Sequence, residues 1–99
     1  MTIAVAMPDM MDRSRLGAVD VTVVRDHAAL AASGATLVLV DLDRCDDPSV
    51  FVIDGVRAVG YGSHVDDERL AAARELGYAE VLPRSVFFRR LPELVEHTS

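Results

Sequence analysis

The most constraining feature of this sequence is a run of consecutive apolar residues, Leu37-Val38-Leu39-Val40, that ends in a carboxylate, Asp41. Alternation of apolar and polar residues would leave one face of a strand in water, whereas continuous apolarity indicates that both faces are buried. Such burial is typical of a strand in the middle of a parallel sheet that is covered by helices on both sides. We therefore expect an α/β domain.

Similar short apolar runs lie on both sides of this segment, and polar or Ala-rich stretches separate them. The expected strands are residues 3–7, 21–24, 37–42, 57–61 and 80–82. Alternation of strands with helices predicts a parallel sheet with right-handed crossovers. A chain of 99 residues suffices for one domain, which we expect to span residues 1–99.

Two segments carry clear helix signals. Residues 25–33 have a possible N-cap at Asp26 and end at Gly34, and residues 66–76 begin with acids and end at Gly77. In the second segment Leu70, Ala73 and Leu76 are expected to share a face.

Three other segments have weaker signals. Residues 9–19 allow a short first helix, and residues 50–53 allow one or two turns within an acidic loop. Because a proline disfavours helical angles in the residue before it, Pro92 predicts a turn over residues 86–90 and a helix that starts near Pro92.

Charge and cysteine content exclude several classes of function. The chain has 16 acidic and 10 basic residues, the latter all Arg, for a net charge of −6. We therefore expect no nucleic-acid binding and no binding to anionic membranes. A single cysteine, Cys45, excludes an internal disulfide framework and suits a reducing compartment. With no signal-peptide pattern and no apolar run of membrane-spanning length, we expect a cytoplasmic protein.

Functional residues in parallel α/β sheets gather at the carboxyl ends of the strands. In this sequence, these ends are residues 7–9, 41–47, 62–64 and 83–85. Ser63 and His64 are adjacent, so they are unsuited to act as a nucleophile and its base, and we expect residues 60–63 to form a turn.

Three of these segments, taken in order, resemble a response-regulator receiver domain of the CheY-like type. They are Leu37-Val38-Leu39-Val40-Asp41-Leu42, Val59-Gly60-Tyr61-Gly62-Ser63-His64 and Gly77-Tyr78-Ala79-Glu80-Val81-Leu82-Pro83-Arg84-Ser85. The resemblance implies a three-layer, flavodoxin-like fold with five parallel strands in the order 2-1-3-4-5. It also implies that Asp41 matches the phosphoacceptor, and that Ser63 and Arg84 match the hydroxyl and Lys of the family's switch.

The sequence departs from the receiver pattern at the residues on which the family's phosphoryl transfer depends. Receivers hold Mg²⁺ with two carboxylates after the first strand, where this chain has Met7 and Pro8. Neither side chain supplies the oxygen ligands that a hard cation requires. Arg84 replaces the family's Lys with a planar group of different reach. Ser85 and Val81 replace the family's Pro and aromatic residue.

These departures favour a degenerate, receiver-like regulatory module that signals through protein contacts, without enzymatic activity or cofactor. In this interpretation Asp41 only caps a loop. One alternative is a phosphoacceptor receiver that phosphorylates Asp41 with Mg²⁺ at a displaced site formed by Asp9, Asp41 and Asp43. Another alternative is a sensor that binds a nucleotide or flavin at the rim near Ser63 and Arg84.

For protein contacts, the resemblance implies the face formed by the fourth helix, fifth strand and fifth helix. We expect this face to include Arg84, Phe88, Arg89 and Arg90, with Phe87 in the core. Arg and aromatic residues are common anchors of protein interfaces. The expected partner is another protein or a second copy of this chain.

Overall fold

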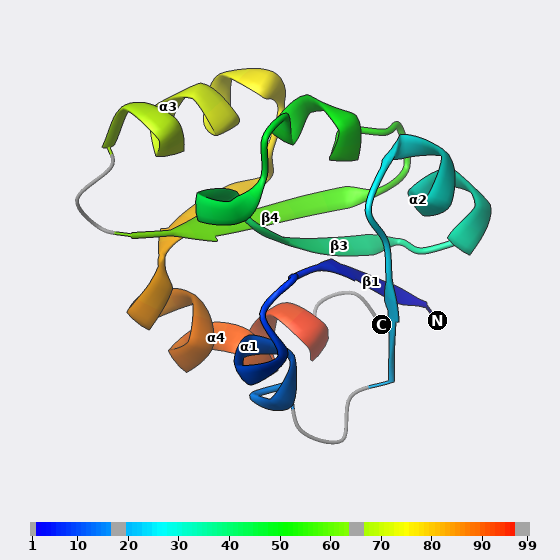
Figure 1. Ribbon diagram of the computed structural model, residues 1–99, viewed down its shortest axis with the longest axis horizontal. Coiled ribbons are helices and arrows are strands. Elements are labelled where there is room, and N and C mark those ends of the chain that lie inside the picture. The colour runs from blue at the N-terminus through cyan, green and yellow to red at the C-terminus, as the bar shows by residue number, and fades with distance from the viewer. Residues whose placement is uncertain (1, 17–19, 64–66, 97–99) are drawn as a thin grey trace.

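A parallel sheet forms the centre of the computed structural model, which describes residues 2–16, 20–63 and 67–96 (Figure 1). The five strands of this sheet are β1 (Ile3–Ala6), β2 (Val21–Val23), β3 (Leu37–Asp41), β4 (Arg57–Gly62) and β5 (Glu80–Pro83). Their order is β2-β1-β3-β4-β5, and every neighbouring pair is parallel. The predicted flavodoxin-like architecture and strand order are therefore confirmed.

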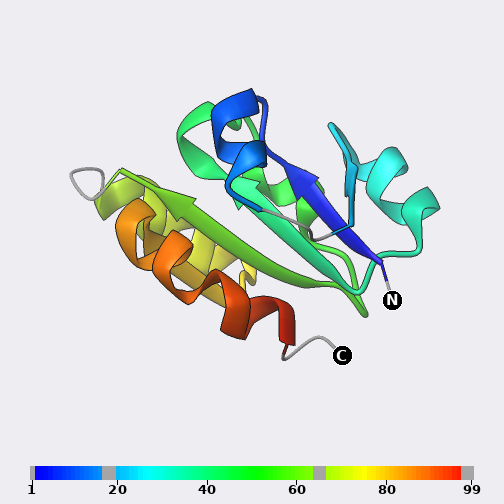
Figure 2. The same ribbon diagram turned by 90° about the horizontal axis from the view of Figure 1, so that it is seen from below.

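Helices cover both faces of the sheet. They are α1 (Met10–Ser14), α2 (His27–Ser33), α3 (Asp67–Leu76) and α4 (Arg84–Glu96), with short 3₁₀ turns η1 (Leu42–Arg44) and η2 (Pro48–Phe51). Figure 1 shows α2 and α3 above the sheet and α1 and α4 below it, and Figure 2 shows α1 and α4 from below. In the resemblance to receivers, α3 and α4 correspond to the expected fourth and fifth helices.

Two apolar clusters, one on each side of the sheet, explain the continuous apolar run in β3. Val38 and Val40 belong to the cluster beneath α2 and α3, whereas Leu37 and Leu39 belong to the cluster that includes residues of α4. All four side chains are fully buried. Successive side chains of β3 therefore alternate between the two clusters, so the strand contributes to the core on both faces of the sheet.

The signals for α2 and α3 are largely confirmed. The Asp26 carboxylate accepts a hydrogen bond from the Ala29 N–H at 2.8 Å, and Gly34 has a φ of 72°, as a helix C-terminus requires. In α3, Leu70 and Ala73 are buried, but Leu76 is 41% exposed because it lies on the last turn. Three residues of the expected helix ends and rim, His64, Asp66 and His97, lie outside the described residues.

The expected break before Pro92 is wrong, because α4 continues from Arg84 to Glu96 with Pro92 inside it. A proline in a helix interior costs about 3 kcal/mol. The helix also buries Phe87, Leu91 and Leu94 against the sheet. Burial of one such side chain contributes about 1.5–3 kcal/mol, so the three together outweigh the cost of the proline.

The expected turn over residues 60–63 is also wrong, since Gly60 and Gly62 belong to β4. A Cβ atom on Gly60 would lie 2.7 Å from Cδ1 of Leu42 and 3.2 Å from Cδ2 of Tyr78. The glycine thus permits close packing of side chains on the strand, instead of a turn.

Within the described part of the chain, none of the helices has both the length and the apolarity needed to cross a membrane.

Candidate functional site

Asp41 lies at the carboxyl end of β3, where its side chain is only 1% exposed. One carboxylate oxygen accepts a hydrogen bond from the Asp43 N–H at 3.1 Å. The other oxygen has no hydrogen-bond partner among the described residues, and Nε of Arg44 lies 3.7 Å away. Burial, together with the negative charge of nearby Asp12, raises the pKa of Asp41 above its ordinary value.

Asp43 is turned toward the end of β4 by the short 3₁₀ turn η1. Its carboxylate accepts a hydrogen bond from the Ser63 N–H at 2.8 Å. The same carboxylate lies close to Gly62, where a Cβ would come within 3.1 Å of Asp43 Oδ1. The turn therefore brings Asp43 and Ser63 together, although Ser63 contributes its backbone to this contact.

Arg84, at the position of the receiver Lys, is paired with Asp12 of α1. The Arg84 guanidinium donates hydrogen bonds to both carboxylate oxygens of Asp12, one of them at 2.9 Å. The Tyr61 hydroxyl donates a third hydrogen bond to Asp12 at 3.0 Å. Burial by itself would raise the pKa of Asp12, but the hydrogen bonds from Arg84 and Tyr61 outweigh it, so this pKa is lowered.

Asp12 is the central residue that sequence reasoning missed. It is 1% exposed and lies in a helix of five residues with no clear apolar period. Its main partner is Arg84, 72 positions away, so no local pattern reveals the pair. The available signal was Arg84 itself, because a guanidinium at a rim that carries several acids favours one of them as its partner.

Asp9 is the remaining carboxylate of the expected metal set. One oxygen caps α1 by accepting from the Met11 N–H at 2.8 Å, and the other accepts from Arg44 at 3.3 Å. Asp9 and Asp41 thus face the same arginine, whereas Asp43 binds the backbone of Ser63. Across residues 2–16, 20–63 and 67–96, no three His, Cys, Asp or Glu side chains are placed to share a metal ion.

Comparison with known proteins adds a structural match to this geometry. No family model matches the sequence, and no curated protein matches it. A crystal structure described as a CpaE2 pilus assembly protein from Sinorhizobium meliloti has 18% identity and a TM-score of 0.60, with 100% of both chains covered. This chain has a receiver-like fold.

On the expected contact face of this receiver-like fold, two of the arginines are paired with acidic residues of the same chain, so part of the positive charge of this face is compensated. Arg90 donates a hydrogen bond to Glu80 at 2.9 Å, and Arg84 is bound to Asp12. Phe88 is half-buried, with the Arg15 guanidinium 4.0 Å from the centre of its ring. Arg89 is exposed.

Phe87 is buried, as expected, and its ring stacks on Tyr61 with 4.2 Å between centroids. The most exposed large apolar side chains among the described residues were not anticipated. They are Met10 and Met11 of α1, each 75% exposed. They belong to the same helix as Asp12 and follow the position of the receiver's acidic pair.

Proposed function

We propose that this chain is a receiver-like regulatory module that acts through protein contacts and does not transfer phosphoryl groups. The observation that carries the proposal is the burial of Asp41, which is 1% exposed. An attacking carboxylate must reach the phosphorus atom of a donor, and a side chain enclosed by the protein cannot do so without local opening.

Charge placement around Asp41 supports the same conclusion. Phosphoryl transfer depends on cations that are positioned to stabilise charge on the transferred group. Arg84 is instead committed to Asp12, and Arg44 is shared between Asp9 and Asp41. Met7 and Pro8 provide no side-chain oxygen after β1.

For the contact surface we propose the face formed by α3, β5 and α4, with Phe88 and Arg89 as its anchors. Phe88 is covered on one side by the guanidinium groups of Arg15 and Arg84, at 4.0 and 5.2 Å from the ring centre. The exposed Arg15 side chain can swing away at little cost and uncover part of the Phe88 ring beside Arg89, whereas Arg84 stays bound to Asp12. The structurally similar protein is described as a pilus assembly protein, and assembly is a process of protein contacts.

The phosphoryl part of the proposal is tested with acetyl phosphate and Mg²⁺, followed by intact-mass spectrometry. We expect no phosphoryl adduct on the wild-type chain, and the same spectrum for Asp41→Asn. An adduct that appears on the wild type and is absent from Asp41→Asn would instead establish the phosphoacceptor alternative.

The contact part is tested by sedimentation velocity over a range of concentrations and by affinity capture. The double variant Phe88→Ala, Arg89→Ala should reduce self-association or partner capture, whereas Ala28→Ser, at an exposed position of α2 outside this face, serves as a surface control. If the double variant associates as the wild type does, the proposed face is wrong.

A further inference from the structure

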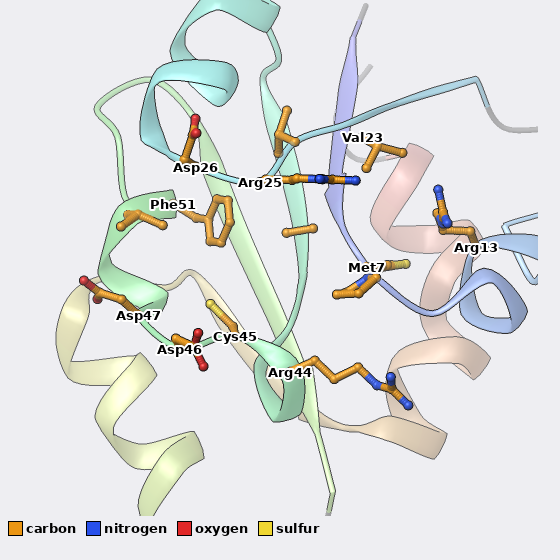
Figure 3. Close-up of a pocket in the computed structure, with 14 residues that line it drawn as sticks. Met7, Arg13, Val23, Arg25, Asp26, Arg44, Cys45, Asp46, Asp47 and Phe51 are labelled. Carbon is orange, nitrogen blue, oxygen red and sulfur yellow. The ribbon is translucent and has the colours of Figure 1, made fainter.

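A pocket of about 510 Å³ lies at the carboxyl ends of β1 and β2, beside the turns η1 and η2 (Figure 3). Among the residues that line it are Met7, Arg13, Val23, Arg25, Cys45 and Phe51. Asp41, Ser63 and Arg84 do not line it. The pocket therefore adjoins the receiver-like site through Met7, Pro8 and Arg44 without including its central residues, and its volume falls in the usual range for small-molecule sites, about 300–1,000 Å³.

Its position in the sheet also favours ligand binding. The chain leaves β1 toward α1 on one face, whereas it leaves β3 toward η1 and η2 on the other face. Loops that diverge in this way open a crevice at the carboxyl ends of adjacent strands, which is where open α/β sheets bind ligands.

Two arginines of the pocket lack partners. Neither Arg13 nor Arg25 forms a side-chain hydrogen bond or ion pair with any residue that the structure describes. Nε of Arg13 is moreover a buried atom without a hydrogen-bond partner. A ligand in the pocket cannot reach this buried atom, so an anion would bind the remaining donors of the two guanidinium groups, whose side chains line the pocket.

Of the acids that line the pocket, Asp26 is next to Arg25 in sequence but caps α2 by accepting from the Ala29 N–H. In Figure 3 the side chains of Arg13 and Arg25 extend toward the region beside Val23 and Met7, whereas Asp46 and Asp47 lie on the other side of the view. Asp47 is already used locally, because it accepts from the N–H and hydroxyl of Ser49. The acids therefore leave the two guanidinium groups free.

The inner wall of the pocket is apolar. Met7 and Phe51 are 1% and 3% exposed, and the half-buried Cys45 lies between η1 and η2. Val23, by contrast, is 45% exposed. A ligand with an apolar body would bury Val23 and rest on Met7 and Phe51.

We propose that this pocket binds a small organic anion, with a phosphate or carboxylate group held by Arg13 and Arg25 and an apolar body against Met7, Cys45 and Phe51. Guanidinium groups suit both head groups because their donors match paired oxygens. In a chain of net charge −6, two unpaired cations at one strand end create a local site for an anion that the overall charge would repel. The proposal does not rest on the proposed function, since Arg13 and Arg25 have no part in that function.

The test is a titration of ¹⁵N-labelled full-length protein with phenyl phosphate and with benzoate, followed by amide chemical shifts. Benzyl alcohol is the neutral probe of the same shape. Both anions should cause saturable shifts at pocket residues such as Met7, Arg25 and Cys45, and the tighter one identifies the preferred head group. Arg13→Gln and Arg25→Gln should each weaken binding roughly tenfold, as expected for one lost charge-assisted hydrogen bond. Arg57→Gln, at the amino end of β4 and away from the pocket, should bind as the wild type does.

Several results would overturn the proposal. These are no saturable shifts at the pocket, equal affinity for benzyl alcohol, or unchanged binding in both pocket variants. Because the same spectra report whether each variant is folded, a loss of affinity counts only where the dispersed amide pattern is retained. If Arg13→Gln does not fold, Arg25→Gln, which changes an exposed residue, tests the proposal by itself.

Discussion

The guanidinium of Arg84 holds the carboxylate of Asp12 with two hydrogen bonds, and so fastens the first residue of α4 to α1 across the end of the sheet. Asp12 is buried, whereas the Arg84 side chain is 41% exposed. Asp12 therefore depends on Arg84 for its hydrogen bonds, whereas Arg84 can form hydrogen bonds with water instead.

Replacement of Arg84 by methionine should destabilise the protein, since it leaves Asp12 buried with only the Tyr61 hydroxyl as a partner. We expect a loss of about 2 kcal/mol in the free energy of unfolding at pH 7, measured by urea denaturation. Arg89→Met, on the same helix but exposed, should change stability by no more than about 0.5 kcal/mol.

The loss in Arg84→Met should also depend on pH. Because the folded-state pKa of Asp12 is lowered, its stabilising contribution is present above the unfolded-state pKa of about 3.9 and is lost as pH falls through the folded value. The difference between wild type and variant should therefore shrink below about pH 4. A difference that stays constant from neutral to acidic pH would refute the ion pair.

Asp41→Asn should stabilise the protein at pH 7, by about 1 kcal/mol, because it removes a buried charge that is only partly compensated. Asparagine retains an oxygen that can accept from the Asp43 N–H. As pH falls, the wild-type carboxyl takes up a proton in the folded state first, since its pKa is raised, so its penalty fades. The advantage of the variant should vanish below about pH 4, and a destabilised variant at pH 7 would contradict this account.

Pro92→Ala distinguishes a continuous α4 from a helix that starts near Pro92. In a continuous helix, alanine restores the N–H and removes the ring, and it should stabilise by about 1–3 kcal/mol. At a helix start, proline is favourable and the change would be neutral or harmful. Thermal denaturation followed by circular dichroism separates the two outcomes.

Gly60→Ala tests the close packing at the middle of β4. The added methyl group would lie 2.7 Å from Leu42 Cδ1, so we expect a loss of about 1–3 kcal/mol from overpacking. If residues 60–63 formed a solvent-exposed turn, alanine would cost little in this position. The double variant Gly60→Ala, Leu42→Ala should recover part of the loss, and a simple sum of the two penalties would argue against direct contact.

Elements with a periodic or continuous apolar pattern could be predicted from the sequence. Burial of β3 on both faces follows from Leu37 to Val40, and the cap of α2 follows from Asp26 and Gly34. The errors occurred where a long-range contact outweighs a local preference. Pro92 argued for a break, but the burial of Leu91 and Leu94 keeps the helix continuous, and Gly60 resembled a turn residue because Leu42 and Tyr78 are distant in sequence.

The candidate site was predictable only in its location. The strand ends correctly placed Asp41, Ser63 and Arg84 at one rim, but the spacing of residues could not assign Arg84 to Asp12, or Asp43 to the backbone of Ser63. The pairing of charges depends on three-dimensional separation and on burial. The unpaired state of Arg13 likewise becomes visible only when the atoms around it are known.

Arg44 contacts both Asp9 and Asp41, and this arrangement restricts the mutational routes by which such a domain could regain phosphorylation. An acid introduced at Met7 would bury a charge at a position that is only 1% exposed, and a lysine at position 84 would lose the paired donors that hold Asp12. Each single step would lower stability before any chemistry returned. Reversion would require coordinated substitutions, so selection acting on single mutations would tend to preserve the present arrangement.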